Sequence, residues 1–132
     1  MANLLWVCFA GALGSGTRYA VGLWASERFG SAFPYGTLFV NILGCFLIAL
    51  VLQTALDRAA FPPALRLALA TGFVGGMTTY SSFAYETVRL ARAGQRAAAL
   101  TNFGLTSVAC FAAVVLGLLL AQLWSAPATE QP

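Results

Sequence analysis

The chain has 132 residues, of which 60% are hydrophobic and 8% are charged, a balance that excludes an ordinary soluble domain and indicates an integral membrane protein. The net charge is +3, but the seven basic residues are scattered along the sequence, without the clustered face that nucleic-acid binding requires, so no nucleic-acid partner is expected. Because the chain has no histidine and no nucleophile placed beside a general base, we do not expect an enzyme.

Uncharged stretches divide the sequence into potential membrane spans. They cover residues 1–17, 29–56, 67–85 and 97–129. Each is long enough, or nearly so, to cross roughly 30 Å of hydrocarbon as a helix. We therefore predict an all-α membrane protein, with a four-helix transmembrane domain at residues 1–126 and a short polar tail at 127–132. Two arginines, Arg58 and Arg66, lie on the side of both termini and three to five lie on the other. This modest asymmetry is a weak orientation signal under the positive-inside rule and leaves insertion in both directions open.

The first predicted span runs from about Leu4 to Trp24 and carries closely spaced glycines, namely Gly11, Gly14, Gly16 and Gly22. Small residues of this kind let a second helix approach closely. Arg18 lies near the end of the span, and two interpretations of it are open. Its side chain either reaches the lipid headgroups or faces a water-filled vestibule, where it attracts anions.

A polar stripe runs along the second predicted span, from about Gly36 to Leu56. Thr37, Asn41 and Cys45 recur every four residues and therefore share one face of the helix. From spacing alone, Asn41 either makes an interhelical hydrogen bond that holds the bundle together or lines a polar path through the membrane.

The third predicted span is interrupted by helix-breaking and hydroxyl residues between Gly72 and Phe83. Gly72 and Gly76 match a small-residue packing pattern, which accounts for the glycines but not for the hydroxyl run at residues 78–82. Backbone groups freed inside a bilayer are costly unless protein, water or an ion satisfies them. We therefore predict an unwound turn whose inward-facing carbonyls hold a hard cation through oxygen ligands.

Aromatic and polar side chains follow the break. Phe83 comes three residues after Tyr80, which places both rings on one side of the resumed helix, and Glu86 lies on the next turn. The fourth span repeats polar or semi-polar residues every four positions, at Asn102, Thr106 and Cys110. The stripes of the second and fourth spans are expected to face one conduit. The odd number and wide spacing of the cysteines argue against a disulfide framework or a zinc site.

Three segments together resemble the Fluc/CrcB family of bacterial fluoride channels, and the resemblance covers essentially the whole chain. The family's hallmarks are an Asn in the second helix and a GFxGGxTTFSTF-like break in the third. The matching segments are the second-span motif Gly36–Gly44 around Asn41, the first-span ending from Gly14 through Arg18 to Tyr19, and the break Gly72–Phe83 followed by Glu86.

The resemblance implies an antiparallel, dual-topology homodimer that crosses the bacterial inner membrane several times and exports fluoride passively through two separate pores. It implies a structural sodium ion at the subunit interface, held by the backbone carbonyls of Gly75 and Thr78 from both subunits. By the same resemblance, each pore is lined by Asn41, Tyr80 and Phe83. Further positions fall on or beside the family's polar track, namely Thr37, Ser82, Glu86, Thr106 and Cys110.

The chain departs from the family pattern at several of these positions. Tyr80 stands where the family usually has Phe, and Asn102 stands where a Tyr often lines the path, so we include Asn102 among the predicted pore residues. Cys110 replaces a hydroxyl residue. Ala49 stands where the second helix often has Gly, which is expected to affect packing more than selectivity.

Two other membrane functions fit part of the pattern. A small dual-topology multidrug transporter would need a carboxylate within the membrane for proton coupling, and Glu86 alone supplies one. A noncatalytic membrane subunit would use the glycines and Asn41 only for packing, which leaves the hydroxyl-rich break unexplained.

Overall fold

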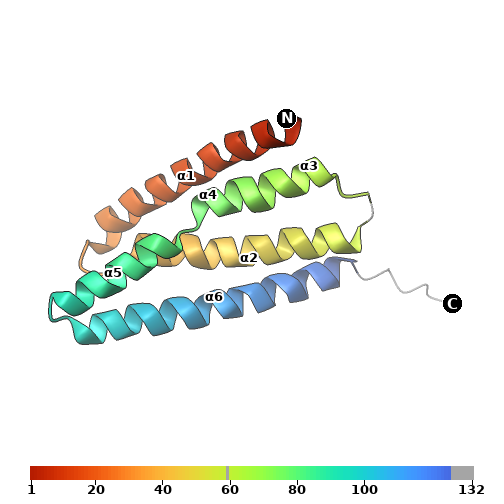
Figure 1. Cartoon of the computed structure of the whole chain (residues 1–132). Helices are drawn as coiled ribbons and strands as arrows, with labels where there is room; N and C mark the ends of the chain where they lie inside the picture. The colour runs from red at the N-terminus through yellow and green to blue at the C-terminus, as the bar shows by residue number, and fades with distance from the viewer. Residues whose placement is uncertain (59, 126–132) are drawn as a thin grey trace.

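Four helical rods lie side by side in the computed structural model, which describes residues 1–58 and 60–125 (Figure 1). Three are single helices, α1 (Ala2–Phe29), α2 (Tyr35–Asp57) and α6 (Arg96–Ser125). The third rod along the chain consists of α3 (Pro63–Arg66), η1 (Leu67–Val74), α4 (Gly75–Met77) and α5 (Tyr80–Arg92). The described residues contain no strand, which confirms the all-α prediction. The tail predicted at 127–132 lies outside the described residues.

Two of the described helices, α2 and α6, are long and apolar enough to cross a membrane by length and composition. Only 28% and 17% of their most apolar windows is buried inside the chain, so most of their apolar side chains face outward, as they would toward lipid. These helices indicate a membrane protein. Glycines, Thr17 and Arg18 make α1 less apolar, and the break divides the third rod. That all four rods cross the bilayer therefore stays a prediction.

Glycines bring α1 and the third rod into close contact. A β-carbon added to Gly76 would lie 2.5 Å from the carbonyl oxygen of Gly11, and one added to Gly14 would lie 2.9 Å from the amide nitrogen of Met77. These distances leave no room for a side chain. The predicted small-residue contact is thereby confirmed at these glycines, whereas Gly16 has no such neighbour within 4 Å.

Gly14→Ala is expected to destabilise the protein by about 3 kcal/mol, because the new methyl group would meet main-chain atoms that no rotamer change can move aside. Thermal unfolding of the purified protein in detergent measures the effect. Gly16→Ala, on the same helix, is the matched control, and its melting temperature should equal that of the wild type. Equal melting temperatures for Gly14→Ala and Gly16→Ala would contradict this packing.

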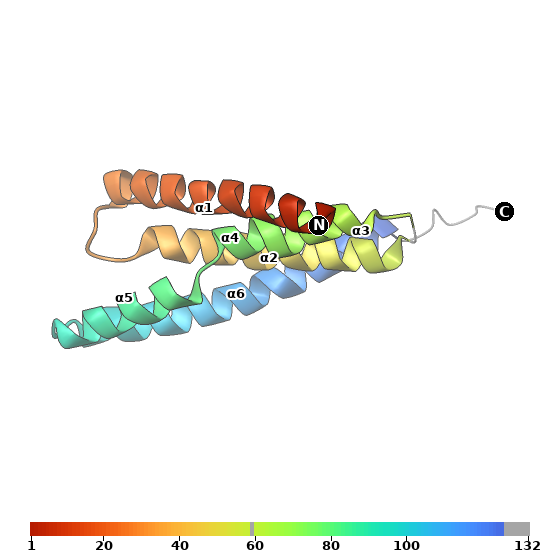
Figure 2. The same cartoon turned by 45° about the horizontal axis from the view of Figure 1, so that its top comes forward.

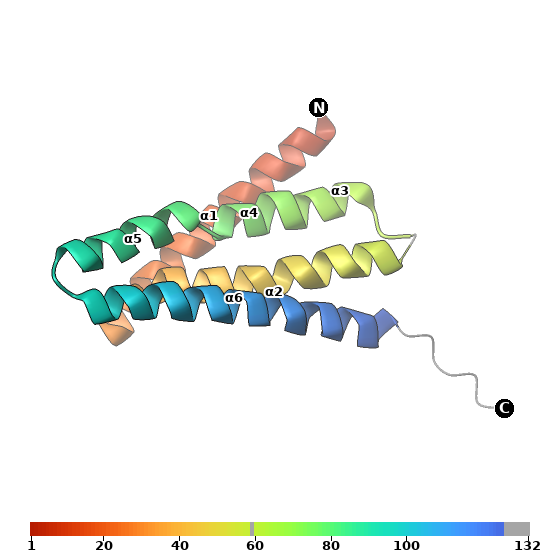
Figure 3. The same cartoon turned by 60° about the horizontal axis from the view of Figure 1, so that its bottom comes forward.

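α2 and α6 pack against each other along much of their length (Figures 2 and 3). Gly117 on α6 permits this approach, since a β-carbon there would lie 2.5 Å from the carbonyl oxygen of Phe46 and 2.9 Å from Cβ of Ala49. Ala49 is buried in this contact. The extra methyl group of Ala49 is therefore accommodated by a glycine on the facing helix.

The third rod changes its packing partner at the break. η1 and α4 pack on α1, whereas α5 packs on α6 (Figure 2). Between α4 and α5, Thr78 and Thr79 have extended dihedral angles, with φ and ψ of −81° and 154° and of −153° and 111°. The predicted interruption is confirmed, but it is narrower than expected. Gly75 and Gly76 remain helical, and Ser82 already lies in the first turn of α5 because the side chain of Thr79 caps that helix.

Candidate functional site

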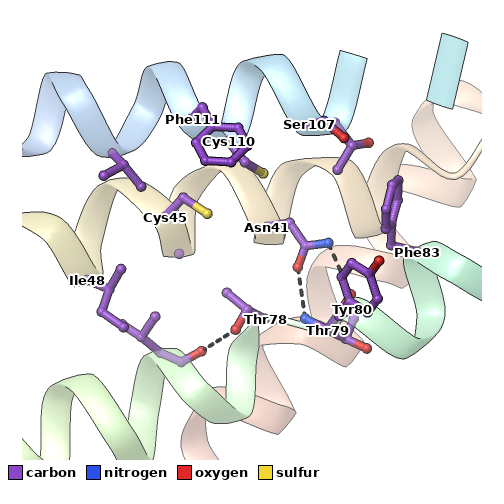
Figure 4. A pocket seen from close by; sticks show the side chains of 14 residues that line it. Asn41, Cys45, Ile48, Thr78, Thr79, Tyr80, Phe83, Ser107, Cys110 and Phe111 are labelled. Carbon is purple, nitrogen blue, oxygen red and sulfur yellow. Dashed lines mark hydrogen bonds between the residues drawn. The ribbon is translucent and has the colours of Figure 1, made fainter. Parts of the chain in front are cut away.

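Asn41 on α2 holds the break of the third rod through both ends of its side-chain amide (Figure 4). Its Nδ2 donates to the carbonyl of Thr79 over 3.1 Å, and its Oδ1 accepts from the N–H of Thr79 over 2.8 Å. Asn41 is only 8% exposed. The interhelical hydrogen bond that the sequence left open is therefore present, and it is made to the main chain. Because an amide nitrogen carries two hydrogens, one of them remains for another acceptor.

Two main-chain carbonyls at the break lack the N–H donors that they would have in a continuous helix. In an α-helix, each carbonyl accepts from the N–H four residues later. The N–H of Thr79, which would serve the carbonyl of Gly75, donates to Asn41 instead. The N–H of Ser82, which would serve Thr78, donates to Oγ1 of Thr79 over 3.2 Å. The carbonyl oxygens of Gly75 and Thr78 are therefore available to another donor or to a cation.

Hydroxyl groups stabilise the helix ends on both sides of the break. Oγ1 of Thr79 donates to Oγ of Ser82 over 3.1 Å and lies 3.1 Å from Oγ of Ser81. Together with the bond from the N–H of Ser82, these contacts make Thr79 the N-cap of α5. The hydroxyl of Thr78 donates to the carbonyl of Val74 over 3.0 Å and so closes the preceding helix. Capping thus accounts for hydroxyls that glycine packing does not explain.

A cavity of about 410 Å³ lies beside the break, between α2, α5 and α6 (Figure 4). We call it the larger cavity. The ring centroids of Tyr80 and Phe83 are 5.7 Å apart in its wall. Phe83 is 6% exposed, whereas Tyr80 is 79% exposed. The structure brings these predicted pore residues together around the larger cavity: Asn41, Tyr80, Phe83, Thr106 and Cys110.

Several lining residues were not predicted as site residues from the sequence. They are Gly44, Cys45, Ile48, Val74, Thr79, Ser107, Phe111 and Val114, and the predicted sodium ligand Thr78 lines the same cavity. The apolar lining residues could not be recognised from the sequence, because an apolar side chain in a membrane segment is equally compatible with facing lipid or facing a cavity. Cys45 and Ser107 did have a signal, since they lie on or beside the polar stripes of the second and fourth spans.

Thr37 and Glu86 lie at a second, smaller cavity of about 170 Å³, which Arg89 also lines. Oγ1 of Thr37 donates to Oε1 of Glu86 over 2.9 Å. The other carboxylate oxygen, Oε2, is buried and has no hydrogen-bond partner among the described residues. The structure therefore joins these two residues of the predicted polar track to each other, at a place separate from the larger cavity. Ser82 lines neither cavity and takes part in the capping contacts instead.

Asn102 lies in the contact between α5 and α6, and it is 1% exposed. Its Nδ2 donates to Oγ1 of Thr87 over 2.8 Å, and its Oδ1 accepts from Oγ1 of Thr106 over 3.4 Å. The neighbouring ring of Phe103 stacks on Phe83 with centroids 6.2 Å apart. The structure thus places Asn102 where it ties α5 to α6, and it does not line the larger cavity.

The guanidinium group of Arg18 lies against the end of α4. Its Nε donates to the carbonyl oxygen of Gly76 over 3.2 Å, and Oγ of Ser15 donates to the same oxygen over 3.4 Å. Neither of the two interpretations of Arg18 drawn from the sequence includes this contact. A signal for it was present in the helical spacing of Gly11, Gly14, Ser15 and Arg18, which places all four on one face of α1.

All three cysteines are free. Within residues 1–58 and 60–125, no three or more His, Cys, Asp or Glu side chains gather as a metal-ligand group. The carbonyl oxygens of Gly75 and Thr78 are groups at the break that could hold a cation.

Fold and site together define a small helical membrane protein in which a buried asparagine clamps a broken helix beside a cavity. A family model, described as "CrcB-like protein, Camphor Resistance (CrcB)", matches residues 5–118. The chain belongs to this family, which confirms the resemblance drawn from its motifs.

Curated relatives cover nearly the whole chain. The "Fluoride-specific ion channel FluC" of Anaeromyxobacter dehalogenans is 51% identical over 120 residues, which are 91% of this chain and 95% of the relative. A protein of the same name from Acidobacterium capsulatum is 48% identical over 114 residues, covering 86% and 91% of the two chains. Another, from Chloroflexus aurantiacus, is 40% identical over 117 residues, covering 89% and 93%. These names describe ion channels, and the chain is not an enzyme.

Proposed function

We propose that the chain is a fluoride-selective ion channel, which exports fluoride passively across the bacterial inner membrane and so relieves fluoride toxicity. The main support for this proposal is the helix break that Asn41 holds by two hydrogen bonds beside the larger cavity. The chain belongs to a family whose cited relatives are named fluoride-specific ion channels.

The physical problem of such a channel is dehydration, because a small, strongly hydrated anion must lose water in a low-dielectric passage. Hydrogen-bond donors and positive ring edges in the protein must replace that water. Asn41 keeps one amide hydrogen that Thr79 does not use. The hydroxyl of Thr106 donates to Asn102 over a long 3.4 Å and can rotate from that bond toward an ion. The rings of Tyr80 and Phe83 have electropositive edges. These groups share one cavity, which supports their assignment as the fluoride pathway.

The channel is proposed to be an antiparallel homodimer with two pores and four membrane crossings in each subunit. Two rings in the wall of the larger cavity, Tyr80 and Phe111, are 79% and 76% exposed, so a single chain does not enclose the path. A second copy related by a twofold axis would complete both cavities in the same way. The arginines differ only modestly in number between the two sides, which leaves insertion in both directions possible.

A structural sodium ion is proposed at the centre of this dimer, bound by the carbonyl oxygens of Gly75 and Thr78 from both subunits. The hydrogen bonds of Asn41 and of the Thr79 hydroxyl leave these carbonyls without their helical partners. Freed carbonyls of broken membrane helices are suitable ligands for sodium. The ion would satisfy groups that are otherwise costly to bury, and Arg18 already satisfies the intervening carbonyl of Gly76.

Removing sodium is expected to lower the thermal stability of the dimer, because a ligand present at 100 times its Kd stabilises the folded state by about 2.7 kcal/mol. The measurement compares protein purified in sodium gluconate with protein purified at equal ionic strength in N-methylglucamine gluconate. Adding sodium back should restore both the melting temperature and the fluoride flux. If melting temperature and flux are the same in both salts, the sodium site is wrong.

Ion flux from liposomes that carry the purified protein tests the proposed function. Fluoride is expected to leave the vesicles rapidly, chloride is expected to stay inside, and neither movement should require a proton gradient. The competing interpretation, a multidrug transporter that uses Glu86, predicts instead that a proton gradient drives uptake of a cationic drug. Equal leakage of the two halides, or gradient-driven drug uptake without fluoride efflux, would refute the channel.

A further inference from the structure

Two cysteines from different helices meet in the wall of the larger cavity. Cys45 is on α2 and Cys110 is on α6, and both line the cavity (Figure 4). The two side chains are neighbours in that wall, on helices that pack against each other. Both thiols are free and neither residue is fully buried. The proposed fluoride pathway has no need of sulfur, so this pair is unexplained by the function described so far.

Two adjacent thiols are good ligands for a particular class of ion. Sulfur is a soft ligand, and soft monovalent cations such as Ag⁺ and Cu⁺ bind well to a pair of sulfur atoms. The wall of the larger cavity contains no histidine and no carboxylate, so hard and borderline cations find few side-chain ligands there. The third cysteine, Cys8, is exposed on α1 and does not line the larger cavity.

We propose that Cys45 and Cys110 form a two-thiol site that binds one soft monovalent cation. The cation replaces the proton of one thiol, and that proton passes to solvent. The second sulfur donates a lone pair and keeps its own proton. The product carries no net charge, which suits a low-dielectric membrane interior.

A cation at this site blocks the ion pathway, a consequence that rests on the proposed channel function. Cys45 follows Asn41 by four residues, and Cys110 follows Thr106 by four residues, which is about 6 Å along each helix axis. A cation held by both sulfurs therefore occupies the space directly beside the proposed donors to fluoride. It also links α2 to α6 across the cavity.

Silver binding tests the site without reference to transport. Purified protein in chloride-free buffer is titrated with silver nitrate, and binding is followed by the ultraviolet absorption of the silver–sulfur bond and by native mass spectrometry. Wild type and Cys8→Ser should bind one ion per chain at this site with equal affinity. Cys45→Ser and Cys110→Ser should each bind at least 100-fold more weakly. Cys110→Ser introduces the hydroxyl that is usual in the family, so it is expected to fold.

The result that would overturn the site is equally tight silver binding by wild type and by the double variant Cys45→Ser/Cys110→Ser. A loss of tight binding in Cys8→Ser would also overturn it, because the ligand would then be Cys8.

Fluoride efflux from liposomes, measured with and without silver in nitrate and gluconate salts, tests the block. For each variant, the flux with silver is divided by the flux of the same variant without silver. A change in the variant's basal flux therefore does not affect this ratio. Silver should reduce the flux of wild type and Cys8→Ser at least tenfold and leave that of the double cysteine variant unchanged. An unchanged flux in silver-loaded wild type, or equal inhibition of the double variant, would overturn the block. Absence of fluoride flux from silver-free wild type would refute the proposed function and the block together, whereas the binding result would stand.

Discussion

Fluoride flux through an Asn41→Asp variant is expected to fall by at least two orders of magnitude. The carboxylate can still accept from the N–H of Thr79, but it cannot donate to the Thr79 carbonyl or to an anion. It also adds a negative charge to the wall of the proposed pathway. Two like charges 4 Å apart repel by about 4 kcal/mol at an effective dielectric constant of about 20, which corresponds to a rate loss of several hundredfold.

Gln53→Glu is the matched control for this change. It makes the same amide-to-carboxylate substitution on the same helix, at a residue outside the larger cavity whose amide contacts Asp57. Its flux should remain close to that of the wild type. Size-exclusion chromatography checks that both variants assemble as the wild type does. Wild-type flux through Asn41→Asp would show that this amide has no part in conduction.

Phe83→Ile is expected to reduce fluoride flux by about one to two orders of magnitude while the protein stays folded. Isoleucine is apolar and of moderate size, but it has no electropositive ring edge to present to an anion. The loss of packing against Tyr80 and Phe103 is expected to cost only about 1–2 kcal/mol of stability. Flux from liposomes and thermal unfolding of the same preparation separate the two effects.

Phe103→Ile provides the comparison, because its ring stacks on Phe83 but does not line the larger cavity. This variant loses the same stacking contact and should conduct nearly as well as the wild type. If the two variants lose flux to the same extent, the effect comes from packing, and Phe83 has no direct contact with the ion.

The helices could be predicted from the sequence because charge and hydrophobicity locate them directly. The predicted second span, Gly36–Leu56, matches α2 to within one residue at each end, and the uncharged run that begins at residue 97 places the start of α6 to within one residue. The break was also visible, because glycines followed by a run of hydroxyl residues are poor helix formers in an apolar segment. The residues at which the break begins and ends could not be predicted, because Thr79 and Ser82 form a cap that starts α5 earlier than composition alone suggests.

The contacts of the site could be predicted only in part. Spacing put Asn41 on a polar face, but it could not show that the partner is the main chain of Thr79, which is 38 residues away in sequence. Asn102 shows the limit more clearly. Its four-residue repeat with Thr106 suggested a conduit, whereas the side chain bonds to Thr87 on a neighbouring helix. Periodicity identifies a face of a helix, but not which neighbouring element that face meets.

The reversal potential of the current through a planar bilayer tests the proposed channel most directly. With fluoride and chloride present on both sides and their gradients in opposite directions, the current should reverse close to the equilibrium potential of fluoride. A reversal near the equilibrium potential of chloride, or midway between the two, would contradict fluoride selectivity. The absence of any ionic current, with fluoride movement only in exchange for protons, would contradict a channel.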